Sequence, residues 1–397
     1  MKIVYLSGTG FTDTDFSIIN AMKTKIDLYY FIIVSPTSLK MSAINIEKQH
    51  PAFGIFRTDI YPEIEKFYDF IDLRKTWVIN KSGKKIEDFC ISIKLTFLLY
   101  KMNIDVLHMS TNYSILTLFL VFLRKKTFLT IHDPIPHSDN NRPKLDFIRR
   151  KITYLFINKY VIYNGNQKNE FIMKYKLQNK KIYVSKFGIV NYLHKYKIIP
   201  IEKNKKQEYI LFFGRITKYK GLDFLFPAMK IVNKTHNIKL VVVGYCRDWY
   251  FDISEYESCP FIEIKNKYIP DSELSILIQN ALFVVCPYVD ATQSGVVMSS
   301  FAFNTPVLAT NTGGLSEYVE HMKSGYIVPP KKIDELAIGI KYLLDNRNLL
   351  SMQKKYIEEK YNRGDYSWDK IVDGIIAFYK ENTTNDREHL PCKPLKS

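Results

Sequence analysis

Residues 286–330, CPYVDATQSGVVMSSFAFNTPVLATNTGGLSEYVEHMKSGYIVPP, alternate apolar strand, glycine turn and helical pattern twice. Where the first helix is expected to begin, the chain offers hydroxyls, an amide and backbone N–H groups: Thr292, Gln293, Ser294, Gly295 and Val296. The second turn is Asn311-Thr312-Gly313-Gly314. Helix N-termini bind anions because their first N–H groups are unpaired and the helix dipole is positive there. The stretch therefore predicts an anion-binding edge of a parallel α/β sheet.

The same alternation extends over the whole chain. Short β-branched or aromatic runs, separated by helical spacing, occur at residues 2–6, 26–34, 106–109, 127–131, 160–163, 209–213, 239–243, 283–286 and 306–309. Near-continuous apolar strands between helices are typical of parallel sheets that are covered on both faces. The predicted fold class is α/β, with two Rossmann-like doubly wound domains facing a cleft.

The length of 397 residues suits two domains of roughly 150 to 200 residues each. We expect an N-terminal Rossmann-like domain at residues 1–195, a charged linker at 196–207 and a C-terminal Rossmann-like domain at 208–365. A helix at 366–380 should pack back on the N-terminal domain, and residues 381–397 should form a polar tail.

Positive charge is concentrated in the first half. The chain has 57 Lys and Arg against 40 Asp and Glu, a net charge of +17. Residues 1–195 hold 30 of these cations and 16 of the acids, which leaves +14 there and +3 in the remainder. Such a surface attracts the phosphates of nucleotides, nucleic acids or anionic lipids. No nucleic-acid recognition motif accompanies it, so we expect no nucleic-acid partner.

The cysteines and the N-terminus predict a cytoplasmic protein. Five scattered cysteines without a CxxC pair predict neither a disulfide framework nor a zinc site. The N-terminus lacks the pattern of a signal peptide. The longest apolar run, Tyr113–Leu123, is about half of what a membrane span needs. We interpret it as a buried helix; the alternative is shallow membrane insertion beside the cations of residues 124–126.

A second basic motif stands at residues 209–232, YILFFGRITKYKGLDFLFPAMKIV. A predicted strand ends at Gly214, and Arg215 and Lys220 follow it. The planar fork of Arg and the point charge of Lys can together hold a diphosphate at a strand edge. A solvated basic turn before a helix explains the local pattern equally well.

Four elements occur in a fixed order: GRITKYKG (214–221), SGVV (294–297) with PVLATNTGGLSEYV (306–319), SGYIVPP (324–330) and YSWDKI (366–371). This order resembles the GT-B retaining glycosyltransferases of family four, the glycosyl transferases group 1. The resemblance covers residues 209–379 well and the first half more loosely, through its opening glycine loop and the TIHD at 130–133. It implies a nucleotide-sugar donor held by the C-terminal domain and an acceptor bound by the N-terminal one.

Carried over by position, the resemblance implies that Arg215 and Lys220 neutralise the departing diphosphate and that the backbone amides of Ser294–Val296 hold its oxygens. This chemistry requires no metal ion and no cofactor, because preorganised cations and dipoles stabilise the leaving group. His132, in the TIHD segment, would lie beside the donor sugar; a capped loop histidine is its structural alternative. Glu317 resembles the acid of the family's GGxxE turn.

The chain departs from the family at a pair of glutamates eight positions apart. Ala291 or Thr292 occupies the first position and Ser299 or Ser300 the second, and none of these is acidic. Asp290 is a candidate for the sugar contact, and either serine for a ribose contact. We interpret the chain as a divergent subgroup. The alternative is a non-catalytic binding or assembly protein that keeps the GT-B shell.

The glycine loop after the first strand is less specific. Gly8 and Gly10 lack the third glycine of a dinucleotide fingerprint, so an NAD-linked oxidoreductase is a weak alternative. We expect the backbone at Gly10 to let a ligand approach the first helix. The segment Asp13-Thr14-Asp15 mimics a metal-binding DxD motif, but its position favours a helix cap. His108 is a further, weaker candidate for the cleft.

Together these features predict a retaining glycosyltransferase that moves a sugar from a nucleotide diphosphate to a hydroxyl of a saccharide. The basic first half and the apolar run point to a lipid-linked acceptor, as in cell-surface polysaccharide or lipopolysaccharide assembly. We expect the protein in the cytoplasm, with peripheral contact to the anionic inner face of the plasma membrane.

Overall fold

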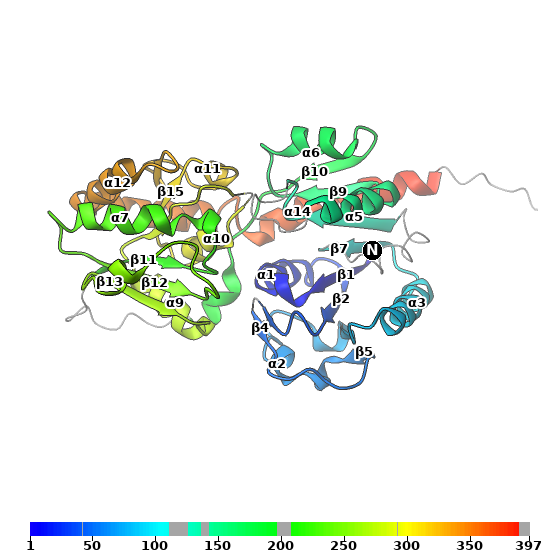
Figure 1. The fold of residues 1–397 in the computed structure, drawn as a ribbon. Coiled ribbons are helices and arrows are strands. Elements are labelled where there is room, and N and C mark those ends of the chain that lie inside the picture. Colours follow the sequence, from blue (N-terminus) through cyan, green and yellow to red (C-terminus); the bar gives the residue numbers. More distant parts are fainter. Residues whose placement is uncertain (42, 111–125, 136–142, 197–207, 292, 389–397) are drawn as a thin grey trace, which may run out of the picture.

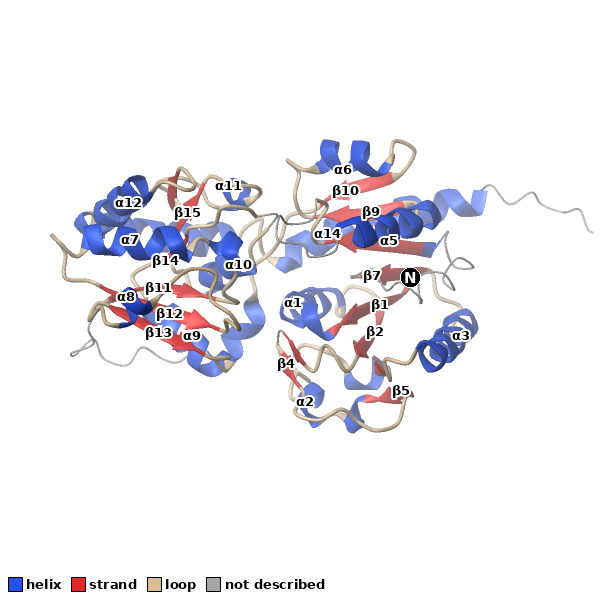
Figure 2. Cartoon of the chain, in the orientation of Figure 1, coloured by secondary structure: helices blue, strands red, loops and turns tan. Residues whose placement is uncertain are grey.

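The computed structural model describes residues 1–41, 43–110, 126–135, 143–196, 208–291 and 293–388. Two lobes lie side by side, each built around a sheet with helices packed on it (Figures 1 and 2). The predicted apolar run Tyr113–Leu123 and nearly all of the predicted linker lie outside the described residues.

The first lobe contains an eight-stranded sheet, parallel except for its last pair. Its strands, in spatial order, are β10 (Lys181–Val184), β9 (Lys159–Ile162), β8 (Thr127–Ile131), β7 (Val106–Met109), β1 (Lys2–Gly8), β2 (Asp27–Val34), β6 (Thr76–Asn80) and β5 (Gly54–Arg57). A separate two-stranded ribbon pairs β3 (Lys40–Met41) with β4 (Ile44–Asn45).

The second lobe contains a six-stranded, wholly parallel sheet. Its strands, in spatial order, are β13 (Ile262–Asn266), β12 (Lys239–Gly244), β11 (Tyr209–Phe213), β14 (Val284–Cys286), β15 (Val307–Thr310) and β16 (Gly325–Val328).

The helices that connect and cover the sheets are α1 (Thr12–Met22), α2 (Pro62–Glu65), α3 (Lys85–Lys101), α5 (Pro143–Phe156), α6 (Lys168–Tyr175), α7 (Leu222–Val232), α8 (Ser254–Glu257), α9 (Asp271–Asn280), α10 (Gly295–Ala302), α11 (Leu315–Tyr318), α12 (Ile333–Asp345), α13 (Arg347–Ile357) and α14 (Trp368–Glu388).

The first sheet is buried on both faces. Along β1, Ile3 and Tyr5 face the core that contains α1 and α14, whereas Val4 and Leu6 face a second core built with α3, α5 and α6. Successive strand residues point to opposite faces, so a strand covered on both sides must be apolar throughout. This explains why β1 appears as a continuous apolar run.

The last helix, α14, packs on the first lobe, where Figure 1 shows it in red. Lys25, in the turn after α1, forms ion pairs with Asp369 at 3.0 Å and Asp373 at 2.8 Å. The ammonium of Lys159 donates to the carbonyl of Asn382 at 2.7 Å. The helix continues to Glu388, so the predicted end at residue 380 was too early.

All nine predicted strands are present, with ends displaced by at most two residues, and the predicted fold class is confirmed. The prediction missed both edge strands of each large sheet, namely β5, β10, β13 and β16, as well as the interior strand β6. Edge strands are partly exposed and need not be continuously apolar; the exposed Lys181 in β10 is an example.

Candidate active site at the domain boundary

The end of β11 meets the first turn of α10 at Gly214. Its φ is +105°, and a Cβ there would stand 2.9 Å from Lys220 Nζ and 3.3 Å from Val296 Cγ2. Glycine is therefore required both for the backbone conformation and for the close approach. The predicted diphosphate ligands, Lys220 and the start of α10, lie together as the sequence indicated.

The ammonium of Lys220 is held inside the protein. Its side chain is only 6% exposed and lies over the ring of Tyr288, with Nζ 5.0 Å from the centroid. The Lys220 pKa is lowered to about 8, mainly by burial; Cys286 opposes this shift and the neighbouring Arg215 contributes to it. Within the described part of the chain no carboxylate pairs with this ammonium. A buried, unpaired cation is costly, and an anionic ligand would neutralise it.

The helix α10 presents an open N-terminus. Ser294 is its N-cap and accepts a hydrogen bond from the Val297 N–H at 3.3 Å. A Cβ added at Gly295 would meet no atom within 4 Å, so there is open space at the first residue of the helix. An anion could therefore approach the unpaired N–H groups of this turn.

The second glycine turn supports the first. Gly313 has a φ of +52°, and a Cβ there would lie 1.5 Å from the carbonyl oxygen of Ala291. The N–H of Gly314 donates to the same oxygen at 3.3 Å. Glycines 313 and 314 thus act as packing residues that hold the loop before α10 in place.

His132 lies at the contact between the two lobes. Its ring stacks on Phe11 at 4.1 Å, and its Nδ1 lies 3.1 Å from the Gln293 amide nitrogen in the loop before α10. Its Nε2 lies 3.1 Å from Ser110 Oγ. Burial lowers the His132 pKa to about 4, so the imidazole is neutral near pH 7. Gly10, in the turn before Phe11, lies in the same loop.

A buried hydrogen-bond chain continues from His132 into the first lobe. The Gln293 amide donates to Nδ1, so Nε2 carries the proton and donates to Ser110. The Ser110 hydroxyl then donates to Asp15 Oδ1 at 3.0 Å, as does the Tyr5 hydroxyl at 2.8 Å. Burial raises the Asp15 pKa to about 7.

Sequence reasoning missed Ser110 as a partner of His132, and Asp15 as the next residue of the same hydrogen-bond chain. Ser110 directly follows β7, which lies beside β8, so the strand-end argument applied to His132 would have found it. The expected capping role of Asp13 and Asp15 was wrong. The helix α1 begins at Thr12 without a side-chain cap, and both acids lie within its first turn.

Glu317 connects the lobes. Its carboxylate accepts hydrogen bonds from the backbone N–H groups of Gly165 at 3.2 Å and Asn166 at 2.9 Å, both in the loop after β9. The next residue, Tyr318, donates its hydroxyl to the carbonyl oxygen of Tyr163. In this arrangement the Glu317 carboxylate holds the domain boundary, and its donor contact stays a prediction.

The two serines proposed for the ribose differ. Ser300 is fully buried and donates to the carbonyl of Val296 at 2.7 Å, and its ribose contact stays a prediction. Ser299, 8% exposed, stays a candidate. Asp290 is partly buried in the loop after β14, and Thr292 lies outside the described residues.

The remaining candidates differ in exposure. Arg215 is exposed beside Gly214. His108 is buried, with its Nε2 2.7 Å from Thr130 Oγ1 and its Nδ1 bonded to the Tyr379 hydroxyl of α14. Burial lowers its pKa to about 3. His108 is therefore a core residue and not the cleft residue expected from the sequence.

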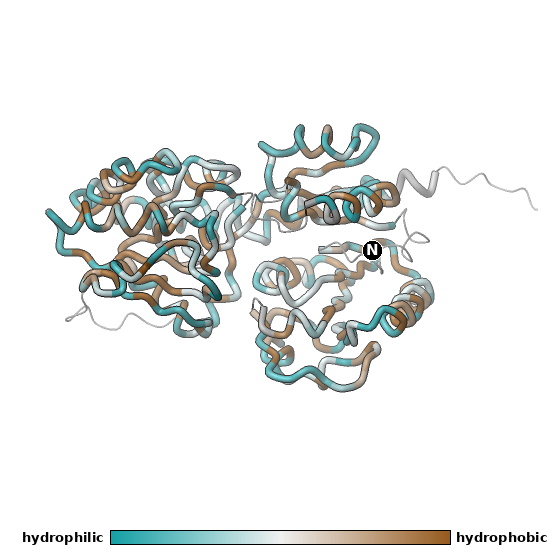
Figure 3. The backbone as a smooth tube through the Cα atoms, in the orientation of Figure 1, coloured by the Kyte–Doolittle hydropathy of each residue, from teal (hydrophilic) through white to brown (hydrophobic). Residues whose placement is uncertain are grey.

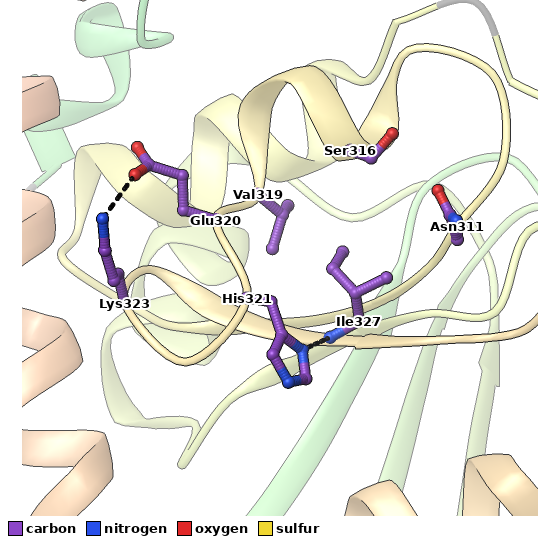
Figure 4. Close-up of a pocket in the computed structure, with 7 residues that line it drawn as sticks. All are labelled: Asn311, Ser316, Val319, Glu320, His321, Lys323 and Ile327. Carbon is purple, nitrogen blue, oxygen red and sulfur yellow. Dashed lines mark hydrogen bonds and ion pairs between the residues drawn. The ribbon is translucent and has the colours of Figure 1, made fainter.

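A hollow beside α11 does not form part of this site (Figure 4). Its charged groups are already paired, because Glu320 bonds with Lys360 and lies 3.6 Å from Lys323, and His321 Nδ1 accepts from the Ile327 N–H at 3.0 Å. We assign it no ligand.

The described residues contain no group of three or more His, Cys, Asp or Glu side chains that could hold a metal ion. None of the described helices is long and apolar enough to cross a membrane.

The two Rossmann-like lobes form a GT-B fold, the architecture of a large class of glycosyltransferases. The buried Lys220 and the N-terminus of α10 lie where the lobes meet. Residues 197–363 match the family model of glycosyl transferases group 1.

Individual proteins agree with this assignment. An uncharacterized glycosyltransferase of Methanocaldococcus jannaschii is 30% identical over 231 residues, which cover 55% of this chain and 53% of the relative. The capsular polysaccharide biosynthesis glycosyltransferase CapM of Staphylococcus aureus is 24% identical over 59% of this chain and 66% of its own length. The match thus spans about half to two thirds of these relatives. The Anabaena protein HepE, solved in complex with UDP, is 14% identical and superposes over 95% of this chain and all of its own with a TM-score of 0.67.

Proposed function

We propose that this protein is a retaining glycosyltransferase that transfers a sugar from a nucleoside-diphosphate donor to a hydroxyl of a saccharide, without a metal ion or other cofactor. The observation that carries the proposal is the buried ammonium of Lys220, which pairs with no carboxylate among the described residues and lies beside Gly214 and the open start of α10. The likeness to HepE, whose complex contains UDP, supports a nucleotide ligand.

In the proposed reaction, the bond between the sugar's anomeric carbon and the diphosphate oxygen breaks, and a bond to the acceptor hydroxyl oxygen forms. Lys220, Arg215 and the α10 N–H groups stabilise the charge that develops on the diphosphate. The acceptor proton leaves with this diphosphate. Retention places the acceptor hydroxyl on the same face of the sugar as the leaving group.

Gln293 and His132 are the proposed contacts of the transferred sugar. Gln293 Oε1 is buried and accepts no hydrogen bond from any described residue, although the amide nitrogen of the same side chain is bonded to His132. A buried acceptor without a donor is destabilising, and a sugar hydroxyl would satisfy it. These residues take the place of the glutamate that the chain lacks. Ser299 and Asp290 stay secondary candidates.

For the acceptor we propose a lipid-linked saccharide at the cytoplasmic face of the membrane. The support is the charge of +14 in residues 1–195 and the similarity to a capsular polysaccharide glycosyltransferase. An anionic bilayer would attract this lobe and raise the local concentration of acceptor.

The test compares Lys220→Ala and Arg215→Ala with Lys218→Ala, an exposed lysine in the same turn. Calorimetry with UDP, ADP and GDP measures nucleotide affinity, and sugar release from matching nucleotide sugars measures turnover. Both quantities should fall about tenfold or more in Lys220→Ala and Arg215→Ala. The Lys218 variant should match the unmodified protein. Full affinity and turnover in both site variants would refute the assignment.

The non-catalytic alternative has one observation in its favour. The positions of the missing glutamates are buried wherever the structure describes them: Ala291 is 1% exposed, Ser299 is 8% exposed and Ser300 is fully buried. Tight nucleotide binding with no sugar release from any nucleotide sugar, with or without saccharide acceptors, would favour this alternative.

A further inference from the structure

Helix α3 carries large apolar side chains on its solvent face. The five exposed side chains are Ile86 (80% exposed), Phe89 (44%), Ile93 (46%), Phe97 (70%) and Tyr100 (77%). Their spacing of three, four, four and three residues places them in one stripe along the helix. Exposed apolar residues are ordinary when scattered, but a continuous stripe marks an interaction surface.

The stripe is separate from the face that holds α3 on the protein. Ile91, Leu95 and Leu99 are buried in the second core of the first lobe. At 100° per residue they lie on the opposite side of the helix from Ile93 and Phe97. A helix that needed only to cover the sheet would carry polar residues on its outer side.

Helix α5 repeats this feature on the same face of the sheet. Its Tyr154 belongs to the second core, whereas Ile148, Ile152 and Leu155 are exposed at a spacing of four and three residues. Figure 3 shows apolar residues along α3 in brown. We call the exposed apolar residues of α3 and α5, with the cations that flank them, the α3–α5 surface.

The flanking charges are mainly positive. Exposed cations lie along both helices, at Lys85, Lys94, Lys101, Lys144, Arg149 and Lys151. On α3 the acid Glu87 already lies 3.4 Å from Lys84, and Asp88 is buried 3.2 Å from Lys81. The surface thus presents apolar anchors surrounded by cations that have no acidic counterpart on α3.

We propose that the α3–α5 surface docks on an anionic lipid bilayer, with Phe97, Tyr100 and the aliphatic side chains inserted at the interface. Apolar anchors bordered by lysines are the features that hold a helix in the plane of a charged membrane. A second copy of the chain fits less well, because a twofold dimer through this surface would place cations against cations. The proposed lipid-linked acceptor gives this docking a purpose, because docking would bring the protein to such an acceptor. In this respect alone the inference rests on the proposed function.

Flotation of the full chain with vesicles tests the apolar part. The protein should float with phosphatidylglycerol–phosphatidylcholine vesicles and remain unbound with phosphatidylcholine alone. Phe97→Ser together with Ile93→Ser should lower the partition coefficient about tenfold or more. Ile338→Ser is the control, since Ile338 is 56% exposed on α12 in the other lobe; it should bind as the unmodified protein does.

The charge part is tested by Lys94→Glu with Lys101→Glu, against Lys234→Glu, an exposed lysine of the second lobe. Only the Lys94→Glu, Lys101→Glu variant should float less than the unmodified protein, and high salt should reduce this difference in flotation. Equal binding of all variants, binding indifferent to lipid charge, or lipid-independent self-association that Phe97→Ser abolishes would overturn the proposal.

These outcomes are separable from those for the proposed function. Phe97→Ser should bind UDP as the unmodified protein does, and Lys220→Ala should still float. If the chain binds no nucleotide but floats with anionic vesicles, the proposed function fails and the docking surface stands; nucleotide binding without flotation gives the reverse.

Discussion

Lys220, a residue of the proposed donor site, is expected to lower the stability of the protein. Its ammonium is buried, and burial lowers its pKa to about 8 from an ordinary value of 10.5. Replacing it with Met, which has a similar length and no charge, should raise the free energy of unfolding at pH 7 by roughly 1–3 kcal/mol. The same variant should lose its stabilisation by nucleoside diphosphates. Thermal unfolding with and without nucleotide measures both; a Met variant that is less stable would contradict the argument.

The pH dependence of Lys220 has a definite sign. Between about pH 8 and 10.5 the unfolded chain keeps a proton on this lysine that the folded chain has released. Relative to the Met variant, the unmodified protein should therefore gain stability as pH rises through this window. Denaturant unfolding of both proteins at several pH values isolates the contribution.

Ser110 contacts His132, and we expect it to position this residue. Its hydroxyl lies 3.1 Å from His132 Nε2 and donates to Asp15 Oδ1. Ser110→Ala should reduce kcat roughly five- to tenfold, the equivalent of one hydrogen bond, with little change in KM for the donor. Rescue by Ser110→Thr distinguishes positioning from packing. An unchanged kcat in the Ala variant would remove Ser110 from the mechanism.

At the scale of an element, α10 matters through its first turn. Gly295 has open space where a Cβ would stand, whereas Gly313 has a positive φ and contacts the Ala291 carbonyl. Gly295→Ala should therefore fold normally and weaken UDP binding, because the added methyl group occupies the path of the phosphate. Gly313→Ala should lower the free energy of unfolding by about 2 kcal/mol or more.

Gly295→Ala and Gly313→Ala are compared with each other, because the first should affect UDP binding and the second stability. Calorimetric titration with UDP and thermal unfolding should be performed on both. If Gly295→Ala bound UDP as tightly as the unmodified protein, the start of α10 would not be the phosphate site.

For the whole molecule, the arrangement of the two lobes depends on Glu317. Its carboxylate accepts two N–H groups of the first lobe, from Gly165 and Asn166. Glu317→Ala should shift the molecule toward an open arrangement by about 1–2 kcal/mol. X-ray scattering should then give a larger radius of gyration without nucleotide. Glu335→Ala, at an exposed position on α12, is the control; equal radii in both variants would argue against this role.

The sequence by itself determined the fold class and placed most of the proposed donor-site residues at the ends of strands. Continuous apolar strands can be satisfied only inside a covered parallel sheet, and glycines after such strands mark its ligand edge. Gly214, Lys220 and Ser294–Val296 were found this way, because each lies within a few residues of a strand end. These patterns are local in the sequence, so they can be recognised without knowing which elements pack together.

Only the tertiary structure decided the contacts that cross between elements. His132 and Gln293 are 161 residues apart, and Glu317 bonds to backbone groups that have no sequence signature. Nor could spacing tell which of the two apolar faces of α3 is buried and which is exposed. Burial depends on which surfaces the rest of the chain covers, and that is a property of the folded molecule alone.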